Sequence, residues 1–285
     1  MKKQLSNFIL VLMFLTGLGI LLYPILANAW NTKVQSQVIT DYESVLSSMD
    51  KEDYSKFFLE ADAFNDMLLK MDKPLFHTRD LTEYDEILTV PGTNVMGYIA
   101  IEKIKVEIPI YHGTSAEVLN AGAGHLKGTS FPVGGPGTHC ALSAHRGLPS
   151  AKLFTDLDKM EIGDTFTITV LDRLLTYQVN QILIVEPKDL EALAIEPDKD
   201  YCTLVTCTPY GINTHRLLVR GIRVDNAIEK PKINVKNEAN RVNPLWVAPF
   251  VSIPVLIIAV EAMMITGRFK KHHSVTGGKK NEKKS

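Results

Sequence analysis

The chain has 285 residues, of which 45% are hydrophobic and 22% charged, and 31 basic against 32 acidic side chains give a formal net charge of −1. This composition is that of a folded protein, so it excludes a chain that is disordered throughout. The charge balance taken alone argues against a nucleic-acid-binding protein, which would be strongly basic.

Two long apolar stretches divide the chain, residues 8–29 and residues 244–266. Each exceeds the roughly 20 residues that a helix needs to cross a bilayer. Two lysines precede the first stretch, and seven basic residues against one acidic residue follow the second. Residues 30–243 hold 22 basic and 30 acidic side chains, a net charge of −8. The positive-inside rule therefore predicts two membrane spans, with both termini cytoplasmic and the acidic middle outside.

Each stretch also has a second interpretation. The first contains Ala27-Asn28-Ala29, which fits the cleavage site of a signal peptide. Its apolar run is longer than a typical signal peptide, which favours a retained anchor. The second could be a buried core helix, but the basic tail behind it favours membrane insertion, with Glu261 near the cytoplasmic end.

Residues 33–71 lack Pro and Gly and carry apolar side chains at a spacing near 3.6. This pattern predicts two amphipathic helices, with Ser48 or Asp50 capping the break between them. Residues 72–92 follow, with Lys73-Pro74 at the start and Pro91-Gly92 at the end. Pro and Gly at both ends predict a connection rather than a regular element.

From residue 94 onward, short β-branched and aromatic runs alternate with turn signals. The predicted strands are Val95–Ile101, Val106–Tyr111, His139–Ala144, Thr165–Val170, Leu174–Val185, Tyr201–Cys207 and His215–Val224. Helical turns are predicted at residues 115–120, with Ser115 as the cap, and at residues 150–157. So many short strands indicate a mainly β unit, either a closed barrel or a sandwich.

The three cysteines, Cys140, Cys202 and Cys207, are an odd number, so at least one thiol is free. There is no C-x-x-C pair and no His/Cys cluster at zinc spacing, so we expect neither a metal nor another cofactor. Cys207 ends a predicted strand, because Pro209 cannot continue a β-ladder. Its thiol therefore opens onto a loop, whereas Cys202 lies on the opposite face and Cys140 lies within an apolar strand.

A thiol nucleophile needs a proton partner and a donor for the substrate oxygen. His145 follows the predicted strand at residues 139–144 and lies beside a loop. Arg216 comes nine residues after Cys207, across the turn Pro209-Tyr210-Gly211. In a hairpin both would lie near the loop end, where a guanidinium suits an oxyanion or a carbonyl.

The run Thr203-Leu204-Val205-Thr206-Cys207 resembles the TLxTC signature of sortases, the transpeptidases of Gram-positive cell surfaces. Further blocks agree with that family: residues 97–99 with 108–113, 124–126 with 128–130, and 145–149 with 151–154. Residues 207–221 and the second apolar stretch resemble the pilus-building class C enzymes in particular.

The resemblance implies an eight-stranded β-barrel with N-terminal helices and a site at one end. Cys207 would be the nucleophile, His145 the proton shuttle and Arg216 the holder of the scissile carbonyl or oxyanion. Thr206 and Thr208 would be neighbours of the substrate and the oxyanion.

The implied reaction cuts an LPxTG-like sorting signal between Thr and Gly, and passes the thioester-bound chain to a pilin lysine. The partners would then be pilin subunits and the membrane, with no nucleic acid and no metal. The implied location is the extracellular face of the cell membrane of a Gram-positive bacterium.

Class C sortases often carry a lid with an Asp-Pro-aromatic tripeptide, which this sequence lacks. The nearest candidate is Asp72-Lys73-Pro74-Leu75-Phe76, so Asp72, Pro74 and Phe76 are the candidate lid residues. The alternative is a plain linker between helix and barrel.

The expected organisation is a membrane anchor or signal segment (1–29), a helical region with the candidate lid (30–92), a catalytic barrel (93–225), a polar tether (226–243), a second span (244–266) and a basic tail (267–285). Three other functions are compatible with parts of this pattern. One is a sortase that anchors surface proteins to a cell-wall precursor. Another is an L,D-transpeptidase, although the Ser-His-Gly sequence of that family is absent. The third is a bitopic scaffold without catalysis.

Overall fold

The computed structural model of the chain describes residues 2–226. The chain forms two compact units, whose described parts are residues 2–22 and residues 23–226. Helix α1 (Lys2–Ser47) begins in the first unit and ends in the second. The predicted second span, the tail and all but the first residue of the tether lie outside the described residues.

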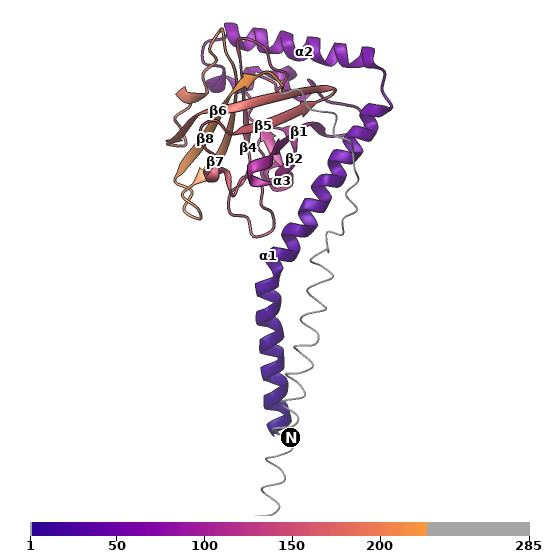
Figure 1. Cartoon of the computed structure of the whole chain (residues 1–285), viewed down its shortest axis with the longest axis vertical. Helices are drawn as coiled ribbons and strands as arrows, with labels where there is room; N and C mark the ends of the chain where they lie inside the picture. The colour runs from indigo at the N-terminus through magenta and orange to yellow at the C-terminus, as the bar shows by residue number, and fades with distance from the viewer. Residues whose placement is uncertain (1, 227–285) are drawn as a thin grey trace, which may run out of the picture. The chain divides into compact units, whose positions relative to one another are not determined.

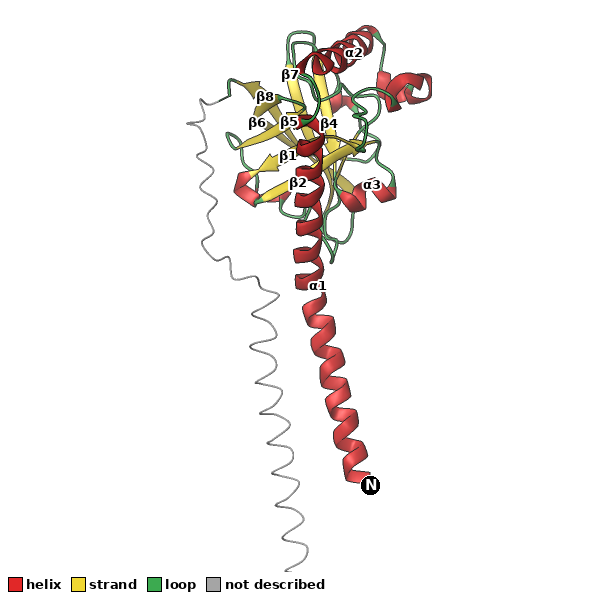
Figure 2. Ribbon diagram, turned by 90° about the vertical axis from the view of Figure 1, so that its right-hand side faces the viewer, coloured by secondary structure: helices red, strands yellow, loops and turns green. Residues whose placement is uncertain are grey.

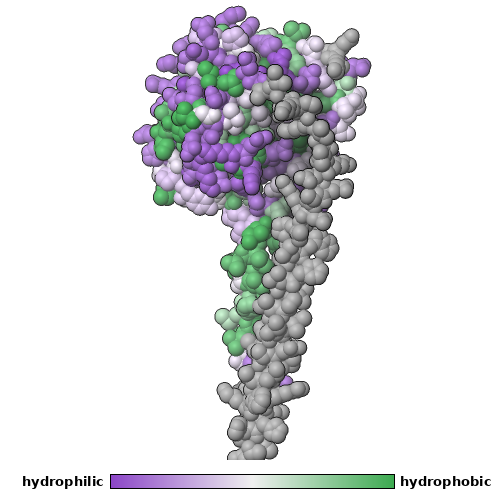
Figure 3. All heavy atoms as spheres, in the orientation of Figure 1, coloured by the Kyte–Doolittle hydropathy of each residue, from purple (hydrophilic) through white to green (hydrophobic). Residues whose placement is uncertain are grey.

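Helix α1 is the one helix among the described residues that is long and apolar enough to cross a membrane, judged by length and composition. Its N-terminal part is covered with exposed apolar side chains, as Figure 3 shows. The predicted anchor and the first predicted amphipathic helix are one continuous helix, without a break near residue 29.

The second unit is built around a closed barrel of eight strands (Figures 1 and 2). The ring order is β1-β2-β3-β4-β7-β8-β6-β5, and β5 pairs back to β1. The strands are β1 (Val95–Ile101), β2 (Val106–His112), β3 (Ala123–His125), β4 (Thr138–Ser143), β5 (Thr165–Val170), β6 (Arg173–Val185), β7 (Asp200–Thr208) and β8 (His215–Val224). The closed eight-stranded barrel implied by the resemblance is confirmed.

Alternation along the strands fills the barrel interior. Cys202 and Leu204 of β7 point inward and join Cys140 and Leu142 of β4 in the hydrophobic core. The next side chains along each strand therefore lie on the outer face. All seven predicted strands are confirmed, and β3 is an eighth that no prediction from the residues included.

The helical predictions have mixed outcomes. Helix α2 (Lys51–Lys70) begins after Asp50, and α3 (Ala116–Ala121) is capped by Ser115, whose side chain accepts a hydrogen bond from Val118 N at 3.3 Å. The helical turn predicted at residues 150–157 is wrong, because turns and a 3-10 helix at Leu157–Lys159 replace it. Leu153 has a φ of 39°, which an α-helix cannot contain.

The segment predicted as a connection, residues 72–92, contains three 3-10 helices, at Pro74–Phe76, Thr78–Asp80 and Thr82–Asp85. Tyr84 anchors it to the barrel: its hydroxyl accepts from Gly113 N at 2.9 Å and lies 2.9 Å from His125 Nδ1. The Tyr84 ring stacks on Phe131 and His125, and burial raises the pKa of Tyr84. Hence residues 78–90 are a packed part of the fold.

Helix α2 covers the end of the barrel where β4 and β7 begin. Asn65 of α2 exchanges two hydrogen bonds with the backbone of Phe131, at 2.7 and 3.2 Å. Arg173, the first residue of β6, stacks on Phe58 of the same helix. The opposite end, where β4 and β7 finish, is where the sequence places its candidate catalytic residues.

Within the second unit, α1 holds the loop that follows β4. Asn28 Oδ1 accepts from Lys152 N at 2.8 Å, and Asn31 Nδ2 donates to Ser150 O at 2.8 Å. These asparagines are three residues apart and share one face of the helix. Farther along, Gln35 reaches Ala121 O at 3.0 Å, so polar side chains fix α1 to the barrel.

We predict that the Asn28→Ala, Asn31→Ala double variant has a free energy of unfolding about 2 kcal/mol lower than the parent chain, because it loses two hydrogen bonds worth about 1 kcal/mol each. Thermal unfolding of the detergent-solubilised chain measures this. The matched control is Gln37→Ala, whose side chain is exposed and bonds only Asp41 in the described part of the chain. Equal melting temperatures for the two variants would contradict the role of the asparagines.

Candidate active site

Two strands bring His145 and Cys207 together. Strands β4 and β7 are parallel, and Ser143 is in register with Val205. The pairing continues past β4, because Ala144 N donates to Val205 O at 3.2 Å. Two residues further along each chain, His145 comes level with Cys207 on the neighbouring strand, at the roughly 4.8 Å spacing of adjacent strands.

Strand β8 adds Arg216 on the other side of Cys207. The β7 and β8 strands form the expected antiparallel hairpin, with Cys207 directly opposite Arg216. Directly opposed residues have Cα atoms about 4.5–5.5 Å apart and side chains on one face. His145, Cys207 and Arg216 therefore form a row across three adjacent strands, here called the catalytic row, on the outer face at one end of the barrel.

All three residues of the catalytic row are half-buried, so the thiol and its neighbours are open to a substrate. The guanidinium of Arg216 donates through Nη1 to Asn213 O at 3.3 Å and His215 O at 3.0 Å. These bonds hold it at the loop end of the hairpin. Among the described residues its other donors make no hydrogen bond, so they can meet a substrate oxygen.

Thr206 and Thr208 lie on the inner side of β7 and are buried. The Thr206 hydroxyl donates to Ala144 O at 2.8 Å, and the Thr208 hydroxyl accepts from Arg146 Nη1 at 3.1 Å. Both hydroxyls thus bind the chain around His145. The expectation that these threonines neighbour the oxyanion stays a prediction.

The other two cysteines lie inside the barrel. Cys140 and Cys202 are register partners on β4 and β7, and each is buried. Burial raises the pKa of the Cys202 thiol, because the apolar interior disfavours a thiolate. Of the three thiols, Cys207 alone is half-buried and not fully buried.

The described residues contain no cluster of three or more His, Cys, Asp or Glu side chains placed to hold a metal. The row itself supplies a thiol, an imidazole and a guanidinium. These groups suit acyl transfer, in which a thiolate attacks a carbonyl, an imidazole moves the proton and a cation stabilises the oxyanion.

His139 lies on the same outer face, six residues before His145. Its Nδ1 donates to Ala194 O at 2.8 Å, because a carbonyl can only accept, and its Nε2 lies 2.7 Å from the Thr203 hydroxyl. Burial lowers the pKa of His139 to about 4, and Arg220 adds to the shift. His139 is therefore neutral and holds the β6–β7 loop on the barrel.

We predict a pH-dependent stability that depends on His139. An unfolded histidine titrates near pH 6.5, so the unfolded chain binds the extra proton between about pH 6.5 and 4, and stability falls as the pH falls through that window. The free energy of unfolding, measured with denaturant, should fall between pH 7 and pH 4.5. The fall should be about 2 kcal/mol larger in the parent chain than in His139→Gln. The exposed His215, changed to Gln, is the control. A His139→Gln variant with the full pH dependence would contradict this.

The candidate lid lies away from the catalytic row. Pro74 and Leu75 of the lid segment pack against Gly128. On either side of Gly128 the backbone is bonded to β4, from Leu126 N to Ala141 O and from Ser130 N to His139 O. Gly128 is thus level with Cys140, about 17 Å along the strand from His145. Phe76 is 66% exposed and lines a cavity of 520 Å³ between the lid segment and residues 188–195.

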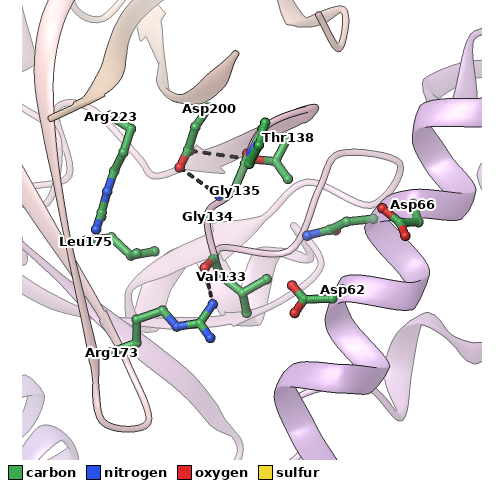
Figure 4. A pocket seen from close by; sticks show the side chains of 12 residues that line it. Asp62, Asp66, Val133, Gly134, Gly135, Thr138, Arg173, Leu175, Asp200 and Arg223 are labelled. Carbon is green, nitrogen blue, oxygen red and sulfur yellow. Dashed lines mark hydrogen bonds between the residues drawn. The ribbon is translucent and has the colours of Figure 1, made fainter. Parts of the chain in front are cut away.

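A second cavity, of 440 Å³, lies at the end of the barrel covered by α2. Figure 4 shows Asp62 and Asp66 on one side and Arg173, Asp200 and Arg223 on the other. Asp200 is bonded by Gly135 N at 2.8 Å and Tyr177 Oη at 2.9 Å. Cys207 comes seven residues after Asp200 along β7, a distance of about 23 Å, so this cavity takes no part in the catalytic row.

Arg146 lies beside the site, and the sequence pattern predicts no role for it. It follows His145, its side chain is 9% exposed, and it contacts both Thr208 and Asp158. The sequence places Arg146 in the block at residues 145–149 that resembles the family. Its partners Thr208 and Asp158 are 62 and 12 residues away along the chain, so the sequence does not reveal them. A charged side chain directly after a predicted strand gave no local sign of burial.

A model of the sortase domain matches residues 99–224. Among solved structures, sortase C1 of Streptococcus agalactiae is 48% identical with a TM-score of 0.62, covering 67% of this chain and 100% of that one. Sortase C of Streptococcus pneumoniae is 47% identical with a TM-score of 0.61, covering 67% and 97%. Sortase C of Clostridium perfringens is 42% identical with a TM-score of 0.59, covering 67% and 100%.

Curated relatives agree over a shorter region. Sortase D of Bacillus subtilis is 30% identical over 131 residues, which are 45% of this chain and 63% of that protein. Sortase A of Streptococcus agalactiae is 33% identical over 117 residues, 40% of this chain and 47% of that protein. The chain thus spans about half to two thirds of the length of these relatives.

The barrel and these matches define the class of protein. The chain belongs to the sortase family of cysteine transpeptidases. The three solved structures named above, which resemble it, are class C sortases.

Proposed function

We propose that this chain is a membrane-anchored transpeptidase that polymerises pilin subunits on the extracellular face of a Gram-positive cell. The observation that carries the proposal is the catalytic row on β4, β7 and β8 in a chain whose structural neighbours are class C sortases. The structure of the Streptococcus pneumoniae neighbour gives insights into its catalysis and pilin substrate specificity, and the Clostridium perfringens neighbour was solved with the C-terminal cell wall sorting motif.

In the first half-reaction the imidazole of His145 takes the proton of the Cys207 thiol, and the sulfur attacks the Thr carbonyl of an LPxTG-like signal. Arg216 stabilises the oxyanion, and His145 gives its proton to the departing glycine amine as the C–N bond breaks. A thioester then joins the substrate to Cys207. The substrate would lie along the outer face of β4 and β7, beside Ser143 and Val205, which are half-buried.

In the second half-reaction a lysine ε-amine of another pilin attacks the thioester. The C–S bond breaks, His145 takes the amine proton, and an isopeptide bond forms. A thioester conserves the free energy of the cleaved peptide bond, and amines attack thioesters readily. Exclusion of water from the acyl-enzyme would favour transfer over hydrolysis.

The test incubates the full chain with a peptide carrying an LPxTG-like signal and follows protein mass. A hydroxylamine-sensitive adduct on Cys207 supports catalysis, and its absence favours the scaffold alternative. A pilin lysine and a cell-wall-precursor amine are then offered as separate acceptors. Transfer to the precursor alone would overturn pilin polymerisation and support the anchoring alternative.

The role of the candidate lid is tested by labelling. We propose that residues 72–76 do not cover Cys207, because Phe76 is 66% exposed and its neighbours contact the barrel level with Cys140. We expect Phe76→Ala to leave the rate of Cys207 alkylation within about twofold of the parent, since a side chain already in water shields little. A much faster rate would show that Phe76 plugs the site.

A further inference from the structure

The residues that follow the nucleophile and the histidine are joined directly. Arg146, next to His145, donates through Nη1 to the hydroxyl of Thr208, next to Cys207, at 3.1 Å. Its Nη2 forms an ion pair with Asp158. Asp158 is 47% exposed, whereas the Arg146 side chain is 9% exposed. The guanidinium is thus held from two sides within the end of the barrel.

A second hydrogen bond joins the ends of β4 and β7 on the other side of His145 and Cys207. The Thr206 hydroxyl donates to Ala144 O at 2.8 Å. His145 and Cys207 therefore lie between two side-chain bonds, one residue before them and one residue after. Two bonds that span the same pair of strands restrict both the separation and the twist of the strand ends.

The arrangement around Arg146 is costly for the fold. Its Nε is buried and has no hydrogen-bond partner among the described residues. Burying a charged group with an unsatisfied donor opposes folding, and a well-packed apolar side chain of similar volume is often as stable. Stability alone therefore does not account for an arginine at this position.

The loop that Arg146 begins is also fixed against the β7–β8 turn. Gly147 has a φ of 81°, and a Cβ placed there would lie 3.0 Å from the Tyr210 ring. Gly147 N donates to Thr155 Oγ1 at 3.1 Å, and Phe154 N donates to His145 O at 3.1 Å. These contacts hold the backbone around Arg146, from which its side chain reaches both Thr208 and Asp158.

We propose that Arg146 is a positioning residue, which sets the distance between the His145 imidazole and the Cys207 thiol by binding Thr208 and Asp158. The inference rests on the proposed function, in which that distance governs proton transfer. A displacement of about 1 Å in such a pair can reduce a rate by about 100-fold.

The test compares Arg146→Met and Arg146→Lys in the full chain, with rates of acyl-enzyme formation measured against peptide concentration. We expect Arg146→Met to lower kcat about 10- to 100-fold with KM within about threefold, because the peptide contacts are intact. Arg146→Lys should restore part of kcat, since an ammonium can meet one partner but not hold both in a planar fork. Failure of the lysine variant to exceed the methionine variant would overturn the proposal.

Arg173→Met is the matched control. Arg173 is bonded to Val133 O at 2.7 Å and stacked on Phe58 at the opposite end of the barrel, so its loss should change the melting temperature and leave kcat unchanged. A double variant of Arg146→Met with Thr208→Val should be no slower than Arg146→Met alone, since both remove one bond. If the kcat losses of the two single variants add up in the double variant, the proposal is contradicted. It is also contradicted if kcat falls only in proportion to the fraction of unfolded protein.

The rate of Cys207 alkylation by iodoacetamide at pH 7 separates this proposal from the proposed function. It needs no peptide, but it depends on the imidazole beside the thiol. We expect at least a threefold change in Arg146→Met and none in Arg173→Met. Unchanged alkylation in Arg146→Met overturns the positioning role. A parent chain that forms no thioester overturns the proposed function, and the alkylation rates still decide the role of Arg146.

Discussion

Replacing Cys207 by Ala should abolish thioester formation, a loss of more than about 10⁴-fold, because the row then has no nucleophile. The thiol lies at the end of β7 on the outer face, between His145 and Arg216, and is half-buried. Intact-protein mass spectrometry after incubation with a sorting-signal peptide measures the adduct directly. An adduct that persists in the Cys207→Ala chain would remove the basis of the proposed mechanism.

Cys202→Ala is the matched control, since it removes a thiol from the same strand but from the barrel interior. Cys202 is 0% exposed and packs against Cys140 in the core. We expect this variant to form the thioester normally and to lose about 1–2 kcal/mol of stability through the small cavity it creates. Loss of the adduct in a folded Cys202→Ala chain would show that the interior cysteine takes part in catalysis.

Replacing Arg216 by Met should lower the rate of acyl-enzyme formation about 100- to 1000-fold, the usual effect of losing one oxyanion donor. Arg216 lies directly opposite Cys207, and its fork is held near the hairpin loop by the carbonyls of Asn213 and His215. Most of the loss should fall on kcat, because the charge on the oxygen develops in the transition state. Single-turnover kinetics with a sorting-signal peptide measure it.

The chain offers a closely matched control in Arg220, which lies on the same face of β8, four residues from Arg216. Arg220 stacks on Tyr201 and lies 3.9 Å from Glu196 of the β6–β7 loop. Arg220→Met should therefore lower stability while leaving the rate of acylation within a few-fold. Equal effects of the two substitutions on the rate would argue that Arg216 acts through the fold and not on the oxyanion.

Strand positions were predictable because alternating β-branched and apolar residues are local signals. Strands β1, β5 and β8 begin and end at the residues that the pattern predicts. Strand β3 was missed because Ala123-Gly124-His125 is too short to show a period and contains a glycine, which is depleted in strands. The turn at residues 150–157 was misassigned because its conformation depends on contacts with α1 and with His145.

The catalytic row was predictable in part. Local sequence placed Cys207 and Arg216 near one hairpin end, because a proline and a short turn separate their strands. The approach of His145 depends on a parallel pairing of β4 with β7, which no local pattern encodes. The contacts of Arg146 and of Thr206 depend on the same pairing, so they could be found only from the structure.

The parallel pairing of β4 with β7 also ties the site to the kinetics of folding. Thr206 and Ala144, which bond across this pair, are 62 residues apart, and β5 and β6 lie between them in the chain. Parallel neighbours need such a crossover, and contacts between distant residues form slowly because a long loop must first be closed. The reactive arrangement of His145 and Cys207 should therefore appear together with the closure of the barrel. During refolding, the rate at which Cys207 regains its native alkylation rate would therefore report the rate at which β4 pairs with β7 and the barrel closes.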